Sequence, residues 1–456
     1  MLANKKILSG NEMTTNLRRL YIILLCVFFT IACGVTTPPP PTLPTSTPTL
    51  TPIPTPTPYQ SVPFYVSPTG KNTNGRSWNT AWNELDQIQW EEISPGDTIV
   101  IAGGEYHTQL DVKKSGTPGL PITITTNGEQ VVLDGQRPVP PDCGQKDYPD
   151  VEGKNAIELE GQGYIVIDGR DWRGIVIRNH LRGIGMRLGT YNIIVRNVEI
   201  YDNGWFISSG SRTGPDGPGV NLGGSDILFE RVIIHDNGQD AFQSGRGVWN
   251  FKLRNSWLYN SREHSTMPGK VFNYCQHSDG IQIYGDGVQG PVVIEDSIIG
   301  PSFTQGIIID ENSTVNDVVI KNTLLIGSDN AGIIISDGGQ SSNWTLQNVT
   351  IVQDAEDERS WNLKMNGTGH RIRDSIFWGG PWGIGVFNWS EATRNFNWLT
   401  PDEYNVAIEE NPMFVDGDYS LIQGKGFADF DFTIQNPAIP PGIGSSITSV
   451  AELLDH

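Results

Sequence analysis

VVIKNTLLIGSDNAGIIISDGGQSSNWTLQN, residues 318–348, contains one complete unit of the repeat that decides the fold. It begins and ends with an apolar strand that closes on an asparagine, VVIKN and WTLQN, and it holds the run GIII between them. Alternating apolar positions in these segments predict strands buried on one face. Asn322 and Asn348 are 26 residues apart, which is too long for a hairpin and typical of one turn of a parallel coil.

Both patterns recur along the chain from about residue 65 onward. The closing strand reads IIVRN, ILFER, FKLRN, VVIED and HRIRD at 193–197, 227–231, 251–255, 292–296 and 370–374. The other pattern, a small residue followed by two apolar residues that flank an outward one, reads AIEL, GMRL, GVNL, AFQS, GIQI, GIII, LKM and GIGV between residues 156 and 386. Stacked coils of this kind predict a right-handed parallel β-helix. The closing Asn and Asp residues are expected to be structural, because they tolerate the left-handed turn conformation and can hydrogen-bond between coils.

The composition fits a chain of short strands and tight turns. The 456 residues include 52 Gly and 30 Pro, which mark turns and interrupt helices, so we expect an all-β protein with little helix. The formal net charge of −20 argues against a nucleic-acid partner, because phosphate binding needs a basic face. The same charge would repel a polyanionic glycan, so such a substrate requires a cationic cleft or a bridging metal.

The N-terminal residues 1–33 have the pattern of an export signal. Basic residues precede the apolar run Leu20–Ala32, which is short for a membrane span. The run ends in TIAC, similar to a bacterial lipobox, which makes Cys33 the predicted lipidation site; an uncleaved anchor and simple secretion are the alternatives. Residues 34–63 are rich in Thr and Pro, a composition that favours an extended linker. We therefore expect an extracellular protein that is held at the cell surface by its lipid.

The two ends of the repeat carry a more specific resemblance. Residues 64–135, which open with FYVSPTGKNTNGRSWNTAW and close with VVLDG, resemble the opening cap and first coils of the pectate lyase-like superfamily, closest to polysaccharide lyase families six and nine. NPMFVDGDYSL (411–421) and NPAIPPGIG (436–444) are similar to the closing segment of secreted β-helix proteins. The resemblance implies a single β-helix domain over 64–444, a short tail over 445–456 and a monomer. Its chemistry must be argued from the site.

Two long inserts place a candidate site on one side of the coils. They cover 201–219 and 260–280, and long loops on a rigid scaffold commonly carry function. The outward residues of the GIII-type strands are, in order, Glu158, Arg187, Asn221, Gln243, Gln282, Ile308, Ile334, Lys364 and Gly385. They are polar beside and between the inserts and become apolar after Gln282, at Ile308 and Ile334. Asp240 and Asp279 precede two of these strands at equivalent positions, roughly 4.8 Å apart if their coils are neighbours. Such a pair must share a proton or a cation.

The first interpretation of this face is a polysaccharide lyase. Asp240 and Asp279, with Asp236, would hold Ca²⁺ against a uronate carboxylate, because Ca²⁺ prefers oxygen ligands. Arg246, Lys270 or Arg262 would then remove the C5 proton. The full aspartate cluster and the unambiguous catalytic lysine of a family-nine lyase are missing from the sequence. Asn221, Gln243 and Gln282 are the expected substrate-binding amides, and Trp205 and Tyr284 are candidates for stacking on sugar rings.

Two other interpretations remain open. In a glycoside hydrolase, Asp240 and Asp279 would be the acid and base or nucleophile, at a separation near the retaining geometry of about 5–5.5 Å, and His277 would carry protons. The signatures of the polygalacturonase family are absent. In a non-catalytic glycan-binding or surface scaffold, the aspartates would only end turns and the glutamines would form a ladder. A disulfide between Cys143 and Cys275 is permissible outside the cytoplasm, although several coils separate them.

Overall fold

The structure is a computed structural model that describes residues 61, 63–138, 153–204, 217–260, 278–285, 287–301, 303–310, 313–336, 341–353, 360–386, 388–415 and 430–455. Residues Tyr59–His456 form one compact unit. The export signal with Cys33, the Thr/Pro linker up to residue 60, both cysteines of the proposed disulfide and much of both inserts lie outside the described residues.

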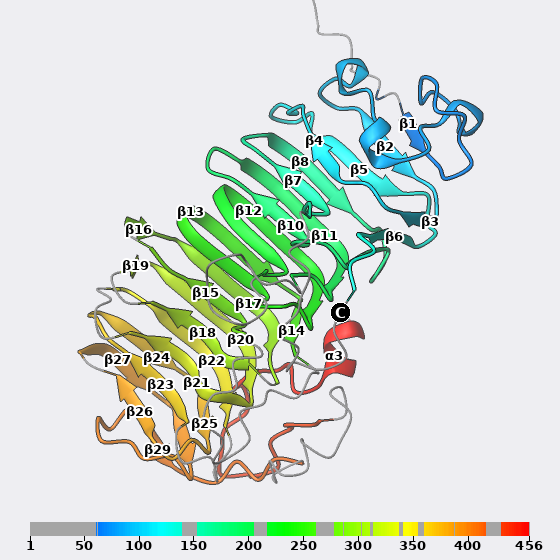
Figure 1. The fold of residues 1–456 in the computed structure, drawn as a ribbon. Helices are drawn as coiled ribbons and strands as arrows, with labels where there is room; N and C mark the ends of the chain where they lie inside the picture. Colours follow the sequence, from blue (N-terminus) through cyan, green and yellow to red (C-terminus); the bar gives the residue numbers. More distant parts are fainter. Residues whose placement is uncertain are drawn as a thin grey trace, which may run out of the picture. The chain divides into compact units, whose positions relative to one another are not determined.

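The described strands stack in parallel into three long faces, with one strand of each face per coil (Figure 1). The first face consists of β4 (Leu110–Val112), β7 (Ile157–Leu159), β10 (Ile184–Met186), the start of β12 (Val220–His235), the start of β13 (Phe242–Arg254), β15 (Ile281–Ile283), β18 (Phe303–Ile309), β21 (Ser328–Ile335), β23 (Trp361–Met365) and β26 (Gly383–Val386).

The second and third faces continue each coil. The second face consists of β1 (Pro63–Val66), β2 (Thr98–Ile101), β5 (Ile122–Thr126), β8 (Gly163–Asp168), β24 (His370–Arg373) and β27 (Trp389–Thr393), with parts of β11 (Tyr191–Tyr201), β12, β13, β17 (Val292–Ile299), β20 (Val318–Ile326) and β22 (Thr345–Val352). The third consists of β3 (Gly104–Tyr106), β6 (Val131–Asp134), β9 (Ile175–Arg178), β14 (Trp257–Tyr259), β25 (Ile376–Trp378), β28 (Phe396–Trp398) and β29 (Ile408–Glu409), with the ends of β11, β12, β17, β20 and β22.

The remaining elements are short. Strands β16 (Gly287–Gln289) and β19 (Ser313–Val315) pair separately. Helical turns η1 (Trp78–Thr80), η2 (Leu85–Gln87) and η3 (Trp90–Glu92) lie in the first coils, and helix α3 (Val450–Asp455) lies near the C-terminus. The expectation of an all-β parallel β-helix with little helix is confirmed.

The closing residue of each repeat turns the chain from the second face to the third. All seven adopt a left-handed φ between 45° and 60°: Asn197, Arg231, Asn255, Asp296, Asn322, Asn348 and Asp374. Asn322 Nδ2 donates to Asp296 Oδ1 of the preceding coil at 2.7 Å. The 26-residue period is confirmed, since Val292 pairs with Val318 and Val319 with Thr345. The Asn and Asp column is therefore structural, as the sequence predicts.

The bore is filled by the inward residues of all three faces. Ile320, Leu346 and Ile333, for example, are fully buried, and each such side chain stabilises the fold by roughly 1.5–3 kcal/mol. The ladder hydrogen bonds between coils satisfy the backbone polar groups of the strands. This rigid scaffold holds the outward side chains of the first face at fixed positions.

The last described segment, residues 430–455, packs on the outside of the third face. Ile298, Leu324 and Ile376 point outward there, and they are buried against residues of this segment: Phe430, Phe432, Ile439, Ile443, Ile447, Val450 and Leu453. The backbone N–H of Ser446 donates to Asn322 Oδ1 at 2.6 Å. Residues 445–455, expected as a separate tail, are thus part of the packed body, because they cover apolar side chains that would otherwise be exposed.

Candidate functional site

The outward row of the first face has almost the register that the sequence predicts. Glu158 pairs with Gly185, Gly185 with Asn221, Asn221 with Gln243, Gln243 with Gln282, and the row continues through Ile308, Ile334, Lys364 and Gly385. The exception is Arg187, which the sequence pattern places where Gly185 lies. Strand β10 ends at Met186, so Arg187 follows the strand instead of occupying its centre.

A chain of hydrogen bonds fixes the amides of this row. Gln243 Nε2 donates to Gln282 Oε1 at 3.2 Å, and Gln282 Nε2 donates to Asp310 Oδ2 at 3.1 Å. Gln243 Nε2 also donates to Asp240 Oδ2 at 2.9 Å. The amide ladder that the sequence suggested is therefore present, and it ends on the carboxylate of Asp310.

A groove of about 670 Å³ opens beside this row. Its lining consists of Met186, Arg187, Leu188, Asn221, Leu222, Gly223, Gly245, Tyr284 and Gly285. Tyr284 is 37% exposed and lies over Gly245, where an added Cβ would be 3.2 Å from the tyrosine hydroxyl. The predicted binding residues Asn221 and Tyr284 thus meet in one groove, and Gln243 and Gln282 lie in the same row of the face.

Arg187 brings a cation into the groove. Its Nε lies 3.0 Å from Glu158 Oε1 and 2.9 Å from Glu160 Oε1, and Glu158 is itself buried and bonded to Asn155. The hydrogen bond and the charge of Glu158 raise the pKa of Arg187 above its ordinary value. The side chain therefore stays cationic and serves as a poor base. Both contacts use Nε, which leaves the two terminal amino groups, a planar fork that fits a carboxylate.

Asp240 and Asp279 do lie on neighbouring coils, but they do not face the groove. Both are fully buried. Asp240 Oδ1 accepts the backbone N–H of Asp279 at 2.8 Å, and Asp279 Oδ1 accepts the backbone N–H of Gln305 at 2.9 Å. The predicted proximity of the two residues is found, but their carboxyls point into the turn and accept backbone N–H groups of the next coil. Their catalytic role stays a prediction.

Burial changes the acidity of Asp279. Burial raises the pKa of Asp279 well above its ordinary value, and the nearby Asp310 carboxylate raises it further. A raised pKa favours the neutral form of Asp279, which lessens the repulsion between two neighbouring carboxyl groups.

Asp236, the third predicted metal ligand, is bonded to a histidine. Its Oδ2 lies 2.7 Å from His235 Nδ1, and His235 Nε2 lies 3.3 Å from Glu199 Oε1. His235 is stacked between Tyr201 and Tyr259. Burial alone would lower the pKa of His235, but the two carboxylates raise it.

The described contacts of the three aspartates are hydrogen bonds and an ion pair. The oxygens of Asp240 and Asp279 accept backbone N–H groups inside the turn, and Asp236 is held by His235. Among the described residues, no group of three His, Cys, Asp or Glu side chains is placed to hold a metal ion. A role for Ca²⁺ stays a prediction without a described ligand set.

Arg246 occupies a bulge at the rim of the groove. Leu222 pairs with Ser244 and Gly224 with Val248, so β13 contains two more residues than β12 between these pairs. Such bulges change the direction of a strand and are common beside active sites. Arg246 follows Gly245, which lines the groove. The backbone position of this candidate base is therefore beside the predicted binding residues.

The other predicted site residues lie outside the described part of the chain; they are Trp205, Arg262, Lys270 and His277. Sequence reasoning missed three contributors to this face. Leu188 and Trp249 are 63% and 46% exposed, and Glu158 anchors Arg187. The sequence pattern did not mark Trp249 as an outward residue, because the bulge shifts the alternation of inward and outward side chains along β13.

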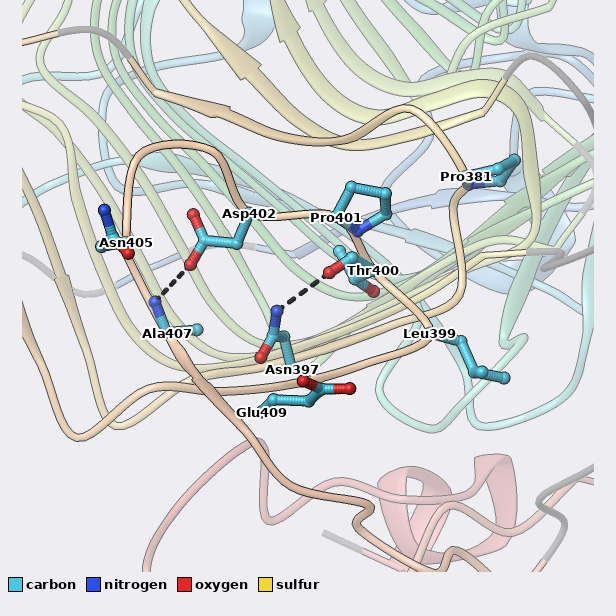
Figure 2. Close-up of a pocket in the computed structure, with 9 residues that line it drawn as sticks. All are labelled: Pro381, Asn397, Leu399, Thr400, Pro401, Asp402, Asn405, Ala407 and Glu409. Atoms are coloured by element: carbon cyan, nitrogen blue, oxygen red, sulfur yellow. Dashed lines mark hydrogen bonds between the residues drawn. The ribbon is translucent and has the colours of Figure 1, made fainter.

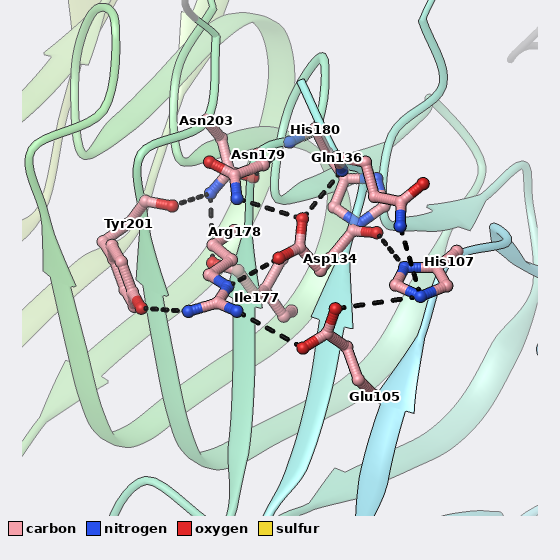
Figure 3. A network of polar contacts seen from close by, with 10 residues as sticks. All are labelled: Glu105, His107, Asp134, Gln136, Ile177, Arg178, Asn179, His180, Tyr201 and Asn203. Atoms are coloured by element: carbon pink, nitrogen blue, oxygen red, sulfur yellow. Dashed lines mark hydrogen bonds and ion pairs between the residues drawn. The ribbon is translucent and has the colours of Figure 1, made fainter. Parts of the chain in front are cut away.

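Two further features have a structural explanation. In Figure 3, Arg178 contacts Asp134 at 2.8 Å, Glu105 at 3.4 Å and the Tyr201 hydroxyl at 3.3 Å, so its charge is shared within the first coils. A cavity of about 610 Å³ lies near the last coils, and Figure 2 shows the residues that line it. Its Asp402 accepts the Ala407 N–H and its Asn397 donates to the Thr400 carbonyl. These polar groups hold their own turn.

Fold and groove define a right-handed parallel β-helix protein with a groove on one face. The fold is similar to that of solved polysaccharide lyases. A pectate lyase, Pel9A, matches with a TM-score of 0.54 and 16% identity over 85% of this chain and 90% of that one. A rhamnogalacturonan lyase matches with a TM-score of 0.51 and 14% identity over 86% of this chain and 98% of that one. At this identity the likeness concerns the fold.

Comparison at the level of sequence finds one short similarity. No family model matches the chain. An uncharacterized protein of Bacillus subtilis strain 168, YwoF, is 40% identical over 73 residues, which are 16% of this chain and 15% of that protein. In the described residues, no helix has the length and apolar character needed to cross a membrane.

Proposed function

We propose that this protein is an extracellular, lipid-anchored polysaccharide lyase whose substrate binds in the groove between Arg187 and Tyr284. The observation that carries the proposal is the fixed Arg187 cation in a groove with an amide row and a tyrosine. A strongly acidic protein needs such a cation to accept a uronate, and the fork of Arg187 matches a carboxylate. The lyase fold of the solved neighbours supports the reaction class by analogy.

The reaction would be a β-elimination. A base removes the C5 proton of the uronate, the C4–O bond breaks, a C4–C5 double bond forms, and the leaving oxygen takes up a proton. Arg187 would neutralise the carboxylate and so acidify the C5 proton. Arg246 at the bulge and Lys270 are the proposed bases. Arg187 itself is not, because Glu158 holds it in the charged form.

A non-catalytic polysaccharide-binding role is the second candidate, favoured by the burial of Asp240 and Asp279. The hydrolase interpretation loses its acid and base pair for the same reason. One assay separates the three: the purified full chain is incubated with a glycan panel, with and without Ca²⁺, while ultraviolet absorbance and reducing ends are followed. New absorbance supports elimination, reducing ends alone indicate hydrolysis, and binding without either indicates a scaffold.

Arg187→Gln tests the groove directly. A charge-assisted hydrogen bond is worth about 1.5–3 kcal/mol, so we expect kcat/KM for an acidic glycan to fall by about 10- to 100-fold. Arg394→Gln is the matched control, because Arg394 is 65% exposed against 67% for Arg187 and pairs with Asp374 away from the groove. Equal activity of both variants would exclude Arg187 from the site.

A further inference from the structure

We infer that the polysaccharide path continues out of the groove of the first face, over an apolar ledge formed by Leu188 and Trp249, into a second groove on the second face. The inference rests on the proposed function to the extent that a glycan must bind. It holds whether or not the glycan is cleaved.

The ledge lies at the corner between the two faces. Leu188 is 63% exposed and also lines the first groove, and Trp249 is 46% exposed. Their side chains meet above Gly247, where an added Cβ would lie 2.4 Å from Leu188 Cδ2 and 3.1 Å from Trp249 Cζ3. The bulge of β13 creates this corner, and Gly247 has a left-handed φ of 70°. Two large apolar side chains exposed together beside a groove are typical of a binding surface.

The second groove begins where the ledge ends. It has a volume of about 410 Å³, and Asn250, the residue after Trp249, is part of its lining. Val166, Ile194 and Leu228, one from each of three neighbouring coils, supply its aliphatic part. Strand β12 carries Asn221 in the first groove and Leu228 in the second, seven residues further on. At about 3.3 Å per residue this path is roughly 23 Å long, enough for several sugar rings.

The chemistry of the second groove suits the uncharged parts of a glycan. A pyranose ring presents an apolar C–H face and a rim of hydroxyls. The aliphatic residues and Tyr164 fit the face, while Asn192 and Asn250 offer amides to the hydroxyls. Lys252 and Asp226 contribute one charge of each sign, so this groove has no net preference for a carboxylate. We therefore assign ring and hydroxyl contacts here and carboxylate contact to Arg187.

Binding of an oligosaccharide length series to the full chain tests the path. Calorimetry on size-fractionated oligosaccharides of the glycan that binds best should show affinity still rising beyond the length that fills the first groove. Trp249→Ala should weaken the long oligosaccharides about tenfold and leave the shortest unchanged, and Leu188→Ser should act in the same direction. Trp78→Ala, at a 43% exposed tryptophan in the first coils, is the matched control and should change neither. Thermal unfolding of each variant checks the fold.

The outcomes separate this inference from the proposed function. If Trp249→Ala and Leu188→Ser bind every length as the wild type does while Arg187→Gln loses binding, the ledge is excluded and the groove of the first face stands. If affinity stops rising at the shortest oligosaccharides that bind, the second groove is excluded. If the wild type binds no glycan of the panel, both the proposed function and the path are wrong.

Discussion

Asp240→Ala should unfold the protein more easily instead of removing a catalytic group. Asp240 is fully buried, and its carboxylate accepts two hydrogen bonds, from the Asp279 N–H at 2.8 Å and from Gln243 Nε2 at 2.9 Å. A buried N–H that loses its acceptor costs about 1–3 kcal/mol, and the lost hydrogen bond to Gln243 adds about 1 kcal/mol. We therefore expect the free energy of unfolding to fall by about 2–4 kcal/mol.

Urea unfolding followed by far-ultraviolet circular dichroism measures this loss. Asp240→Asn keeps an acceptor oxygen and should be destabilised less than Asp240→Ala. Gln243→Ala removes the hydrogen bonds to Asp240 and to Gln282 but leaves the Asp279 N–H its acceptor, so it should be destabilised less than Asp240→Ala. The reasoning would be refuted if Asp240→Ala had the urea midpoint of the wild type and yet lost glycan cleavage, because that combination identifies a catalytic carboxylate.

Three other perturbations test the electrostatics and the turns. Burial lowers the pKa of His180 to about 4, so the folded state resists protonation of this side chain. The free energy of unfolding should fall by about 3 kcal/mol as pH drops from 6.5 to 4. The unfolding temperature of His180→Gln should depend less on pH over this range than that of the wild type. Burial raises the pKa of Asp279, so its ionisation weakens the fold as pH rises above about 3.9. In thermal unfolding from pH 4 to 8, Asp279→Asn should therefore become more stable relative to the wild type as pH rises. A difference in unfolding temperature that stays constant with pH would contradict this. Asn322 has a φ of 45° and donates to Asp296. Asn322→Ala should therefore lower the free energy of unfolding in urea by about 1–2 kcal/mol, and Asn322→Gly should lower it less, because glycine tolerates this φ. Equal losses for the two variants would mean that only the lost hydrogen bond matters and not the left-handed conformation.

The repeat made most of the fold predictable, because a left-handed residue and a fixed side-chain alternation recur in the coils that close between Asn197 and Asp374. The predicted register of the outward row was wrong at one position. Gly183 and Gly185 are both small, and the sequence pattern aligns on Gly185, whereas the strand uses Gly183 as its small residue. That alignment moves Arg187 by two positions along the chain.

The orientation of Asp240 and Asp279 was not predicted, for a related reason. The sequence correctly placed them on neighbouring coils, yet it did not settle which way the carboxyls point. Gln243 is outward and Phe242 inward, so the same alternation extended to Asp240, three residues before Gln243, puts that side chain inside. The ledge was beyond prediction because two additional residues in β13 interrupt the pairing with β12 before Trp249.

The segment 430–455 on the third face also determines when, during synthesis, the outward apolar side chains of that face become covered. In a solenoid each coil normally stabilises through its neighbours alone, so early coils can form while later ones are still being made. Here Ser446 reaches back 124 residues to Asn322, and Leu453 is fully buried. During synthesis, the outward apolar stripe of Ile298, Leu324 and Ile376 therefore stays exposed until residues 430–453 have been made. A premature stop shortly before residue 445 would leave the coils paired but this apolar surface exposed, and aggregation would be its phenotype.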